Sequence, residues 1–394
     1  MIYFDNASTT QVGCELKDVI CNYTFGDYGN PGSIHSLGKK SKTAITESRS
    51  KIAKALNTKA DNIIFTSCGS EANTLGIIGL SNYLLSRKLT HIITTKYEHH
   101  SILNSMKEME RRGFEVTYLD VKNGVVSCDE LIAAIRDNTG LVSVMYVNNE
   151  LGSVNRIQQI YSICKGKGIL FHSDCVQALG TVPINMENTA DLISLSGHKI
   201  HAPKGIGCLC IKDKNLLSNI IYGGEQEFGL RPGTENVPNI IAFGIMVKKA
   251  TTEMRNNLYK IQSVSMHFGA ELMNLCNANG IKYHFNSPEC LNSPKILSVR
   301  FDGIEAETLV LMLSSKGLCA GTGSACSNNS VKPSHVLKAI GLSDEEARST
   351  VRFSFSVYNT VDEAKEAAKM VVDCIQILKV ISPQNILKSS LSAN

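Results

Sequence analysis

The chain lacks several features that mark other classes of protein. Its 394 residues include 13 cysteines but no Cys-x-x-Cys spacing, which disfavours both a disulfide framework and a ribbon-type zinc site. It has no long run of basic residues and a formal net charge of only +4, which argues against a nucleic-acid groove or a membrane-surface helix. No stretch approaches the ~18 consecutive apolar residues of a membrane span.

The N-terminus and the cysteines bear on location. Residues 1–6 lack a charged region followed by an apolar stretch, so we expect no secretory signal. An odd number of cysteines without disulfide spacing is typical of buried free thiols in a reducing compartment. We therefore expect a cytoplasmic protein that binds neither nucleic acid nor a membrane.

Length and pattern predict an α/β chain with two domains. A chain of 394 residues exceeds the roughly 100 to 200 residues of one domain. Short β-branched runs alternate with helical patterns, which is typical of a mostly parallel sheet covered by helices on both faces. The expected strands are 62–66, 91–95, 115–119, 141–147 and 169–173, followed by 192–195 and 206–211.

The rest of the chain has a different pattern of expected strands and helices. The runs 192–195 and 206–211 are separated by too few residues for a crossover helix, so we expect one antiparallel edge on the sheet. A helical stretch from near Asn239 toward Asn277 should lead into the second domain. That domain should contain strand 296–301, helix 306–315, strand 351–354 and a last helix, 362–379, which opens with the capping-box pattern Thr360-x-x-Glu363.

The most informative feature is a lysine and an aspartate that each follow a predicted strand. Lys199 ends Ser196-Gly197-His198-Lys199, and Asp174 follows the preceding strand. Taken alone, such a lysine is usually a solvated loop residue and such an aspartate a helix cap. Together, at the ligand-binding edge of a parallel sheet, they suit pyridoxal 5'-phosphate, which needs an amine for its aldehyde and a carboxylate for its ring nitrogen.

Two further motifs fall on the same edge. Cys68-Gly69-Ser70-Glu71 opens a predicted helix after a strand, where backbone N–H groups and the Ser70 hydroxyl can hold a phosphate; a plain N-cap is the alternative. Glu98-His99-His100 follows another strand, where an imidazole can stack on a flat ring and move protons. Metal binding is the alternative for the paired histidines, but no partner set stands at ligand spacing, and for His100 we favour a surface histidine.

A cysteine in a polar loop is the second strongest signal. Cys326 lies within small and polar residues at 321–329, the setting in which a thiolate can reach another molecule. Cys208 and Cys210 show the contrast, because their spacing puts both on one face of an apolar strand. We interpret that pair as core packing.

These residues belong to motifs that resemble, in order from residue 3 to about 380, the NifS/IscS-type cysteine desulfurases of the fold-type I pyridoxal-phosphate enzymes. The motifs are Asn6-x-x-x-Thr10, Gly29-Asn30-Pro31, Thr66-Ser67-Cys68-Gly69-Ser70-Glu71, Glu98-His99, Asn148-Asn149-Glu150, Asp174-x-x-Gln177, Ser196-Gly197-His198-Lys199, Arg231-x-Gly233-Thr234, Gly323-Ser324-Ala325-Cys326 and Arg352-Phe353-Ser354. The resemblance implies a large domain at 13–255 with a mostly parallel seven-stranded sheet. It also implies a smaller α+β domain, formed by 1–12 and 256–394, that carries the catalytic cysteine loop.

The resemblance implies a homodimeric enzyme that converts L-cysteine to L-alanine and moves the sulfur to Cys326 as a persulfide. The sulfur would serve iron–sulfur cluster assembly or other acceptors, so an iron–sulfur scaffold or a sulfur-carrier protein is the implied partner. Lys199 would bind the cofactor aldehyde and, once displaced by substrate, shuttle the Cα proton. Asp174 would keep the ring nitrogen protonated, and His99 would stack on the ring.

The remaining implied roles concern binding, and no metal is implied. Gln177 and Asn149 would bond the phenolic oxygen side of the cofactor. Its phosphate would be held by Gly69, Ser70, Ser196 and His198, with Thr234 reaching in from the second subunit. Arg352, helped by Asn30, would clamp the substrate carboxylate, because a guanidinium fork matches a carboxylate bidentately.

Two alternatives stay open at the level of the sequence. One is a selenocysteine lyase or another fold-type I lyase or transaminase in which Cys326 is incidental; sulfide release by a Cys326→Ala variant separates it from the desulfurase. The other is a thiol-rich sulfur or metal carrier that only binds partners. A purified protein that stays colourless with added cofactor would favour the carrier.

Overall fold

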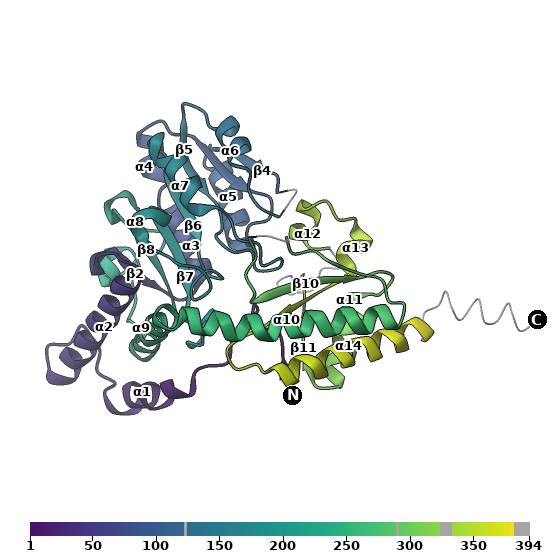
Figure 1. Ribbon diagram of the computed structural model, residues 1–394. Helices are drawn as coiled ribbons and strands as arrows, with labels where there is room; N and C mark the ends of the chain where they lie inside the picture. The colour runs from purple at the N-terminus through teal and green to yellow at the C-terminus, as the bar shows by residue number, and fades with distance from the viewer. Residues whose placement is uncertain (122–123, 289–290, 324–332, 382–394) are drawn as a thin grey trace, which may run out of the picture. The chain divides into compact units, whose positions relative to one another are not determined.

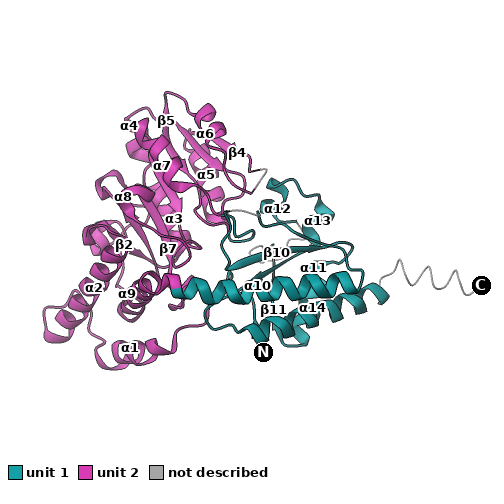
Figure 2. Ribbon diagram, in the orientation of Figure 1, with its two compact units in different colours: residues 1–8, 149–153, 256–394 teal, residues 9–148, 154–255 magenta. Residues whose placement is uncertain are grey.

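The computed structural model describes residues 1–121, 124–288, 291–323 and 333–381, which form two compact units (Figure 2). Unit 1 comprises Met1–Ser8, Asn149–Ser153 and Asn256–Asn394, and unit 2 comprises Thr9–Asn148 and Val154–Arg255. The domain boundaries predicted from the sequence, 13–255 against 1–12 and 256–394, stay a prediction.

Unit 2 is built on a seven-stranded sheet in the order β2-β8-β7-β6-β5-β3-β4 (Figure 1). Neighbouring strands run parallel except that β8 is antiparallel to both β7 and β2, so the predicted mostly parallel seven-stranded sheet is confirmed. The strands are β2 (Ile63–Thr66), β3 (His91–Thr95), β4 (Glu115–Leu119), β5 (Thr139–Ser143), β6 (Leu170–Asp174), β7 (Leu192–Ser196) and β8 (Gly207–Ile211).

The predicted antiparallel strand is present, but its predicted place at the edge of the sheet is wrong. Strand β8 lies between β7 and β2, and all of its residues are buried. The short connection from β7 fixes the direction of β8, because a crossover helix needs more residues. This connection does not determine which strand pairs with the other side of β8. In the structure that strand is β2, the first strand of the sheet along the chain.

Helices complete unit 2. Apolar side chains of α3 and α5, among them Leu75 and Met106, pack with Ile92, Leu192 and Leu209 of the sheet in one buried cluster. The helices are α1 (Lys17–Cys21), α2 (Ser36–Ala55), α3 (Gly69–Ile78), α4 (Ser81–Ser86), α5 (His100–Arg111), α6 (Cys128–Ala134), α7 (Ile157–Gly166), α8 (Met186–Thr189) and α9 (Val237–Thr252).

Unit 1 is a smaller α+β structure, as predicted. Its main sheet has the antiparallel order β12-β13-β10-β9, and β1 pairs in parallel with β11. Phe4, Phe268, Phe353 and Phe355 form the centre of its core, with ring centroids 4.7 to 5.7 Å apart. The elements are β1 (Ile2–Tyr3), α10 (Met254–Ala278), β9 (Tyr283–Phe285), β10 (Ile296–Phe301), α11 (Ala306–Ser315), β11 (Leu318–Cys319), β12 (Gly321–Thr322), α12 (His335–Ala339), α13 (Asp344–Arg348), β13 (Thr350–Ser354) and α14 (Val361–Ile381).

The helical stretch predicted from near Asn239 toward Asn277 is confirmed, and it consists of two helices. Helix α9 ends at Thr252, Glu253 leaves the helical conformation as its cap, and α10 begins at Met254. The predicted capping box of α14 is confirmed: Thr360 N donates to Glu363 Oε2 at 2.9 Å, and Glu363 N donates to Thr360 Oγ1 at 3.2 Å.

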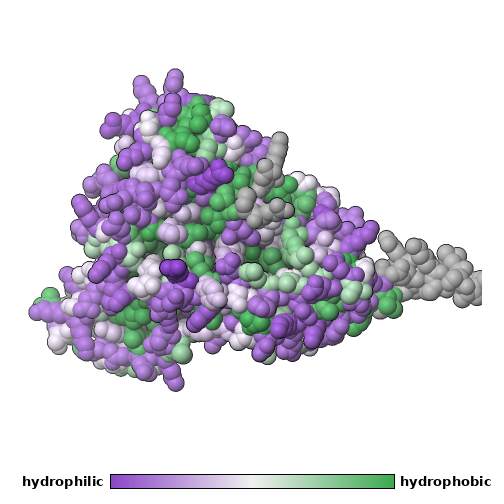
Figure 3. Space-filling model, viewed as in Figure 1, coloured by the Kyte–Doolittle hydropathy of each residue, from purple (hydrophilic) through white to green (hydrophobic). Residues whose placement is uncertain are grey.

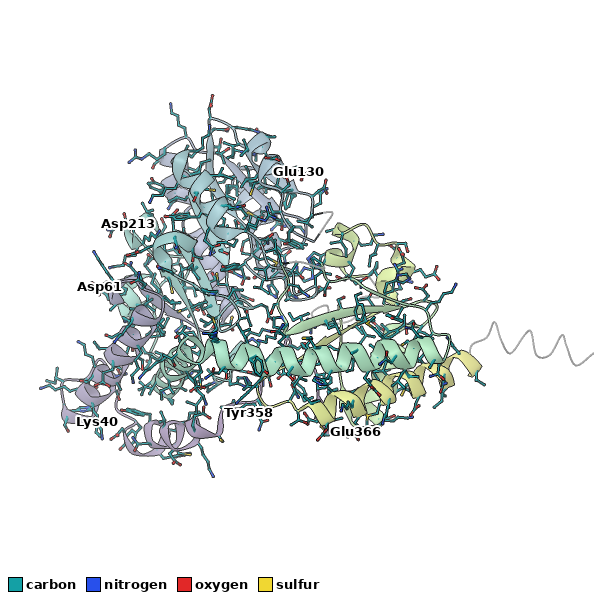
Figure 4. The ribbon with its side chains drawn as sticks, viewed as in Figure 1. Lys40, Asp61, Glu130, Asp213, Tyr358 and Glu366 are labelled. Carbon is teal, nitrogen blue, oxygen red and sulfur yellow. The ribbon has the colours of Figure 1, made fainter. Side chains whose placement is uncertain are left out.

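The surface of both units is predominantly polar on the face displayed in Figure 3. Lys40 on α2 and Glu366 on α14, which Figure 4 labels, are exposed and belong to the polar faces of these amphipathic helices. Within the described ranges, no helix has the length and apolar character that crossing a membrane requires.

Candidate functional site

The carboxyl ends of three parallel strands of unit 2 carry predicted site residues. Asp174 is the last residue of β6 and Ser196 the last residue of β7, while His99 follows β3 as the N-cap of α5. Because parallel strands end at the same edge of a sheet, ligands of such folds bind there. Strands β6 and β7 are neighbours in this sheet (Figure 1), and β5 lies between β6 and β3.

Asp174 is a buried carboxylate with two hydrogen-bond donors. It is 5% exposed, and it accepts hydrogen bonds from Asn73 Nδ2 at 2.8 Å and from the Val176 backbone N–H at 2.9 Å. A buried charge is tolerated only when it is hydrogen-bonded or paired. This carboxylate is therefore suited to holding a cationic group of a ligand.

Lys199 is delivered by a short, tightly packed turn. The 3-10 turn η4 (Gly197–Lys199) follows β7 directly, and a Cβ atom at Gly197 would lie 2.8 Å from Ile206 Cγ2, so only glycine fits. Thr10 braces the turn, because its backbone N–H and its hydroxyl both donate to the His198 carbonyl at 2.9 Å. Lys199, half-buried, thus extends from a rigid support.

His99 is held in place by the start of its own helix. Its Nδ1 accepts a hydrogen bond from the Ser101 backbone N–H at 3.1 Å and lies 2.8 Å from Ser101 Oγ. Burial lowers the pKa of His99; Asp174 opposes this effect, and Lys199 and His100 add to it. The ring is consequently a neutral imidazole at neutral pH, and it lies within electrostatic reach of both Asp174 and Lys199.

The N-terminus of α3 forms an anion cradle with Ser196. A Cβ atom at Gly69 would lie 2.7 Å from Val176 Cγ2 and 3.3 Å from Ser196 Cβ, so the backbone passes close to this side chain. Ser196 is buried, and its Oγ has no hydrogen-bond partner in the described chain. The first N–H groups of a helix lack intrahelical acceptors and favour anions. With Ser70 in the first turn, these groups fit a phosphate.

Two segments next to the cradle carry further predicted residues. Gln177 follows Asp174 by three positions and is buried. Thr234 is exposed, and it lies near Arg231, whose Nε donates to Glu71 Oε1 at 2.9 Å. Burial acts to raise the pKa of Glu71, but hydrogen bonds from Ser67 and Arg231 outweigh it and lower that pKa. The segment with Thr234 is thereby tied to the first turn of α3.

Arg352 lies in unit 1 on β13 and is 5% exposed. Its Nη1 donates to the Asn149 carbonyl at 2.9 Å, and its Nη2 donates to Asp5 Oδ1 at 2.9 Å and to Ser8 Oγ at 2.6 Å. Its Nε has no partner among the residues that the structure describes. Arg352 and the Asn149 backbone are therefore brought together.

Asn30 belongs to unit 2 and is exposed. Its Oδ1 accepts a hydrogen bond from the Gly32 N–H at 2.9 Å. Since Arg352 is part of the other unit, the predicted pairing of these two side chains at a substrate carboxylate stays a prediction.

Cys326 lies outside the described residues, but the two segments that flank its loop are described. A Cβ atom at Gly323 would lie 2.5 Å from Glu150 Oε2, and Ser334 Oγ donates to that same oxygen. Burial raises the pKa of Glu150 to about 7, although Ser334 and Arg352 act in the opposite direction. One buried carboxyl group therefore contacts both flanks of the loop.

Several residues of this site were missed or left without a role by the sequence reasoning. Asn73 and Ser101 bond to the predicted residues but belong to no motif, and Glu98 and Glu150 were noted only as motif letters. Their positions in the sequence could have indicated them. Asn73 follows Ser70 by about one helical turn on α3, and Ser101 follows His99 by two residues.

His172 and the paired cysteines are buried inside the sheet. The ring nitrogens of His172 lie 2.9 Å from Ser143 Oγ and 3.0 Å from Ser194 Oγ, and burial lowers its pKa to about 3. Cys208 and Cys210 are buried with Sγ atoms 3.7 Å apart, which confirms their interpretation as core residues. Across the described ranges, no group of three or more His, Cys, Asp or Glu side chains is placed to hold a metal ion.

Comparisons with known proteins agree with this geometry. The family model for aminotransferase class-V matches residues 2–366. The chain is 38% identical over 384 residues to a cysteine desulfurase IscS of Dictyoglomus turgidum, covering 97% of this chain and 96% of that protein. It is 40% identical over 382 residues to a putative cysteine desulfurase IscS 1 of Bacillus subtilis, covering 96% and 99%.

Solved structures share the fold. A NifS-like protein aligns with a TM-score of 0.88 at 33% identity, covering 96% of this chain and all of that one. A structure described as SspA in complex with cysteine aligns with a TM-score of 0.77 at 33% identity, covering 91% of this chain and all of the other. The similarity therefore spans both units.

Proposed function

This chain belongs to the aminotransferase class-V family and, within it, to the NifS/IscS-type cysteine desulfurases, and from that premise we propose how it works. It is an enzyme that releases sulfur from L-cysteine for iron–sulfur cluster assembly or related acceptors, with L-alanine as the other product. The observation that carries this conclusion is 38–40% identity over nearly the whole chain. The family predicted from the motifs is confirmed.

We propose pyridoxal 5'-phosphate as the cofactor, which the family implies. The residues of unit 2 fit it, because a buried carboxylate, a lysine, a neutral imidazole and an anion cradle stand along one sheet edge. The unused Ser196 hydroxyl and the close approach at Gly69 are the observations that favour a phosphate there. When bound, this cofactor supplies an aldehyde that captures amines and a ring that withdraws electrons.

The proposed roles follow from position, and all of these residues except Asn149, which belongs to unit 1, are in unit 2. The Asp174 carboxylate would hold the ring nitrogen of the cofactor, and the His99 imidazole would lie against its ring. The Lys199 Nζ would hold the cofactor through its aldehyde, and the same amine would be the group that moves the proton at the substrate Cα atom. The phosphate is bound by Gly69, Ser70, Ser196 and His198, and the phenolic oxygen side by Gln177 and Asn149.

The sulfur is proposed to leave by attack of the Cys326 thiolate on the substrate Sγ atom. A bond forms between the two sulfur atoms, the substrate Cβ–Sγ bond breaks, and its electron pair stays on carbon, which a proton then converts to the methyl group of L-alanine. The product is a persulfide on Cys326, ready for a second acceptor. Arg352 and Asn30 bind the carboxylate of the substrate during this step.

We propose a homodimer that works in the cytoplasm. Exposed apolar side chains lie near the start of unit 2, with Phe25 79%, Tyr28 69% and Ile34 88% exposed, which favours a protein interface. The exposed Thr234 is proposed to complete the phosphate site of a second subunit. All described cysteines are free thiols, in keeping with a reducing compartment. An iron–sulfur scaffold or a sulfur-carrier protein is the proposed acceptor.

Two experiments test this proposal. Borohydride reduction of the purified protein followed by peptide mass mapping should place a reduced cofactor adduct on Lys199; an adduct elsewhere, or none, contradicts it. A Cys326→Ala variant should keep its bound cofactor but lose sulfide release from L-cysteine. Unchanged release by that variant would favour a selenocysteine lyase or another fold-type I lyase.

A further inference from the structure

Four side chains of unit 2 form one hydrogen-bonded path. Asn73 Nδ2 lies 2.8 Å from Asp174 Oδ2 and 2.9 Å from Ser101 Oγ. Ser101 Oγ lies 2.8 Å from His99 Nδ1. The path therefore joins the carboxylate at the end of β6 to the imidazole before α5 through one amide on α3.

The direction of each hydrogen bond in this path is fixed by chemistry. The Ser101 backbone N–H can only donate, so His99 Nδ1, 3.1 Å away, is an acceptor and carries no proton. The Asn73 amide must present its NH₂ group to the Asp174 carboxylate, because its oxygen would be repelled there. Its second N–H then points to Ser101 Oγ, which leaves the hydroxyl proton for His99 Nδ1.

We propose that Asn73 and Ser101 are positioning residues of the desulfurase site, which together orient the Asp174 carboxylate and hold His99 as the neutral tautomer protonated at Nε2. The consequence for catalysis rests on the proposed function. Asp174 must serve as counterion of the cofactor ring, and a charged imidazolium beside it would compete for that carboxylate. The path removes this competition, because protonation of Nδ1 would break two hydrogen bonds at once.

Two further observations support the path. Asn73 is 1% exposed, and its Oδ1 has no hydrogen-bond partner in the described part of the chain. Leaving the buried Asn73 Oδ1 without a hydrogen bond costs free energy. The two hydrogen bonds that the Asn73 NH₂ group donates must therefore offset this cost and keep the amide in its orientation. The charged and titratable groups that act on His99 are Asp174, Lys199 and His100, and the net result, with burial as the largest cause, is a lowered pKa.

The chain contains a matched control for Ser101. Ser105 lies one turn further along α5 and is buried, whereas Ser101 is half-buried. Its hydroxyl also reaches α3, where it lies 3.4 Å from Thr74 Oγ1. The replacement Ser105→Ala therefore removes a hydroxyl between the same two helices without breaking the path to Asp174 and His99.

The first test is nitrogen NMR of ¹⁵N-labelled histidine side chains, in protein with and without the cofactor, with His99→Gln used to identify the signal. In the unmodified protein, His99 should be protonated at Nε2 and unprotonated at Nδ1 at neutral pH. Asn73→Ala and Ser101→Ala should raise the pH at which the ring becomes charged, whereas Ser105→Ala should not. Should Asn73→Ala fail to fold, Ser101→Ala carries the test.

The second test is the dissociation constant of the cofactor. We expect Asn73→Ala to raise this dissociation constant at least tenfold, which is about 1.4 kcal/mol. Ser105→Ala should change the dissociation constant by no more than about twofold. A proton on Nδ1 in the unmodified protein, or equal effects of Asn73→Ala and Ser105→Ala, overturns the proposal. If the tautomer is as expected but no adduct maps to Lys199, the proposed function fails while the hydrogen-bond assignment stands.

Discussion

Replacing Glu98 by glutamine should flatten the dependence of stability on pH. Glu98 is fully buried between β3 and α5. Its Oε1 accepts hydrogen bonds from Thr95 Oγ1 at 2.8 Å and from the Met145 N–H at 2.9 Å. A glutamine keeps this oxygen and the size of the side chain, so the variant removes the titration and preserves both of these bonds.

The magnitude follows from the shift of the pKa. Burial raises the pKa of Glu98 from 4.5 to about 8; the Met145 and Thr95 hydrogen bonds oppose this shift and Asp174 adds to it. Between these two pH values the unfolded chain has lost the proton that the folded protein keeps, so the free energy of unfolding falls as pH rises. The loss is complete above pH 8 and absent below pH 4.5. At about 1.4 kcal/mol per pH unit, it reaches at most about 5 kcal/mol.

The assay is urea unfolding of both proteins in steps from pH 5 to pH 8. The difference in free energy of unfolding, glutamine variant minus unmodified protein, should grow steadily with pH. Glu108→Gln is the control, because Glu108 is on α5, its pKa is lowered by a hydrogen bond from Arg112, and it titrates below this window. Parallel curves for Glu98→Gln and the unmodified protein would refute the reasoning.

Three further changes test packing, capping and a buried ion pair by the same unfolding measurement. Phe268→Ala removes the central ring of the unit 1 core and should cost about 3–5 kcal/mol, whereas Phe268→Leu should cost less. Thr360→Ala removes the cap of α14 and should cost about 1 kcal/mol, with Thr360→Ser nearly neutral. Arg49→Met leaves Glu227 buried without its ion pair and should cost about 3–5 kcal/mol; a loss under about 1 kcal/mol would contradict this.

The sequence predicts local elements better than their arrangement. Strands β3, β4 and β10 and helix α11 have the predicted bounds, because each is a compact apolar pattern bounded by polar or turn-forming residues. The place of β8 inside the sheet depended on pairing with β2, which is more than 140 residues earlier in the chain. Local patterns contain no information about such a pairing.

The same distinction applies to the candidate site. Asp174, Ser196 and His99 could be placed at one edge of the sheet from the sequence, because each follows a predicted strand and parallel strands end at the same edge. Asn73 and Ser101 could not, because their roles arise where α3 and α5 meet. Their hydrogen bond joins residues 28 positions apart, and spacing along each helix does not show that the two helices meet at these residues.

Glu98 and Asp174 are two buried carboxyl groups of this site, and their surroundings differ. Glu98 and Asp174 interact electrostatically; Glu98 follows the end of β3, and Asp174 is the last residue of β6. Glu98 is fully buried with a pKa raised to about 8, so it is mostly neutral at pH 7. Asp174 instead accepts hydrogen bonds from two N–H donors. Different surroundings can give two neighbouring carboxyl groups different roles, and in the proposed function Asp174 is the one that would face the ring nitrogen of the cofactor.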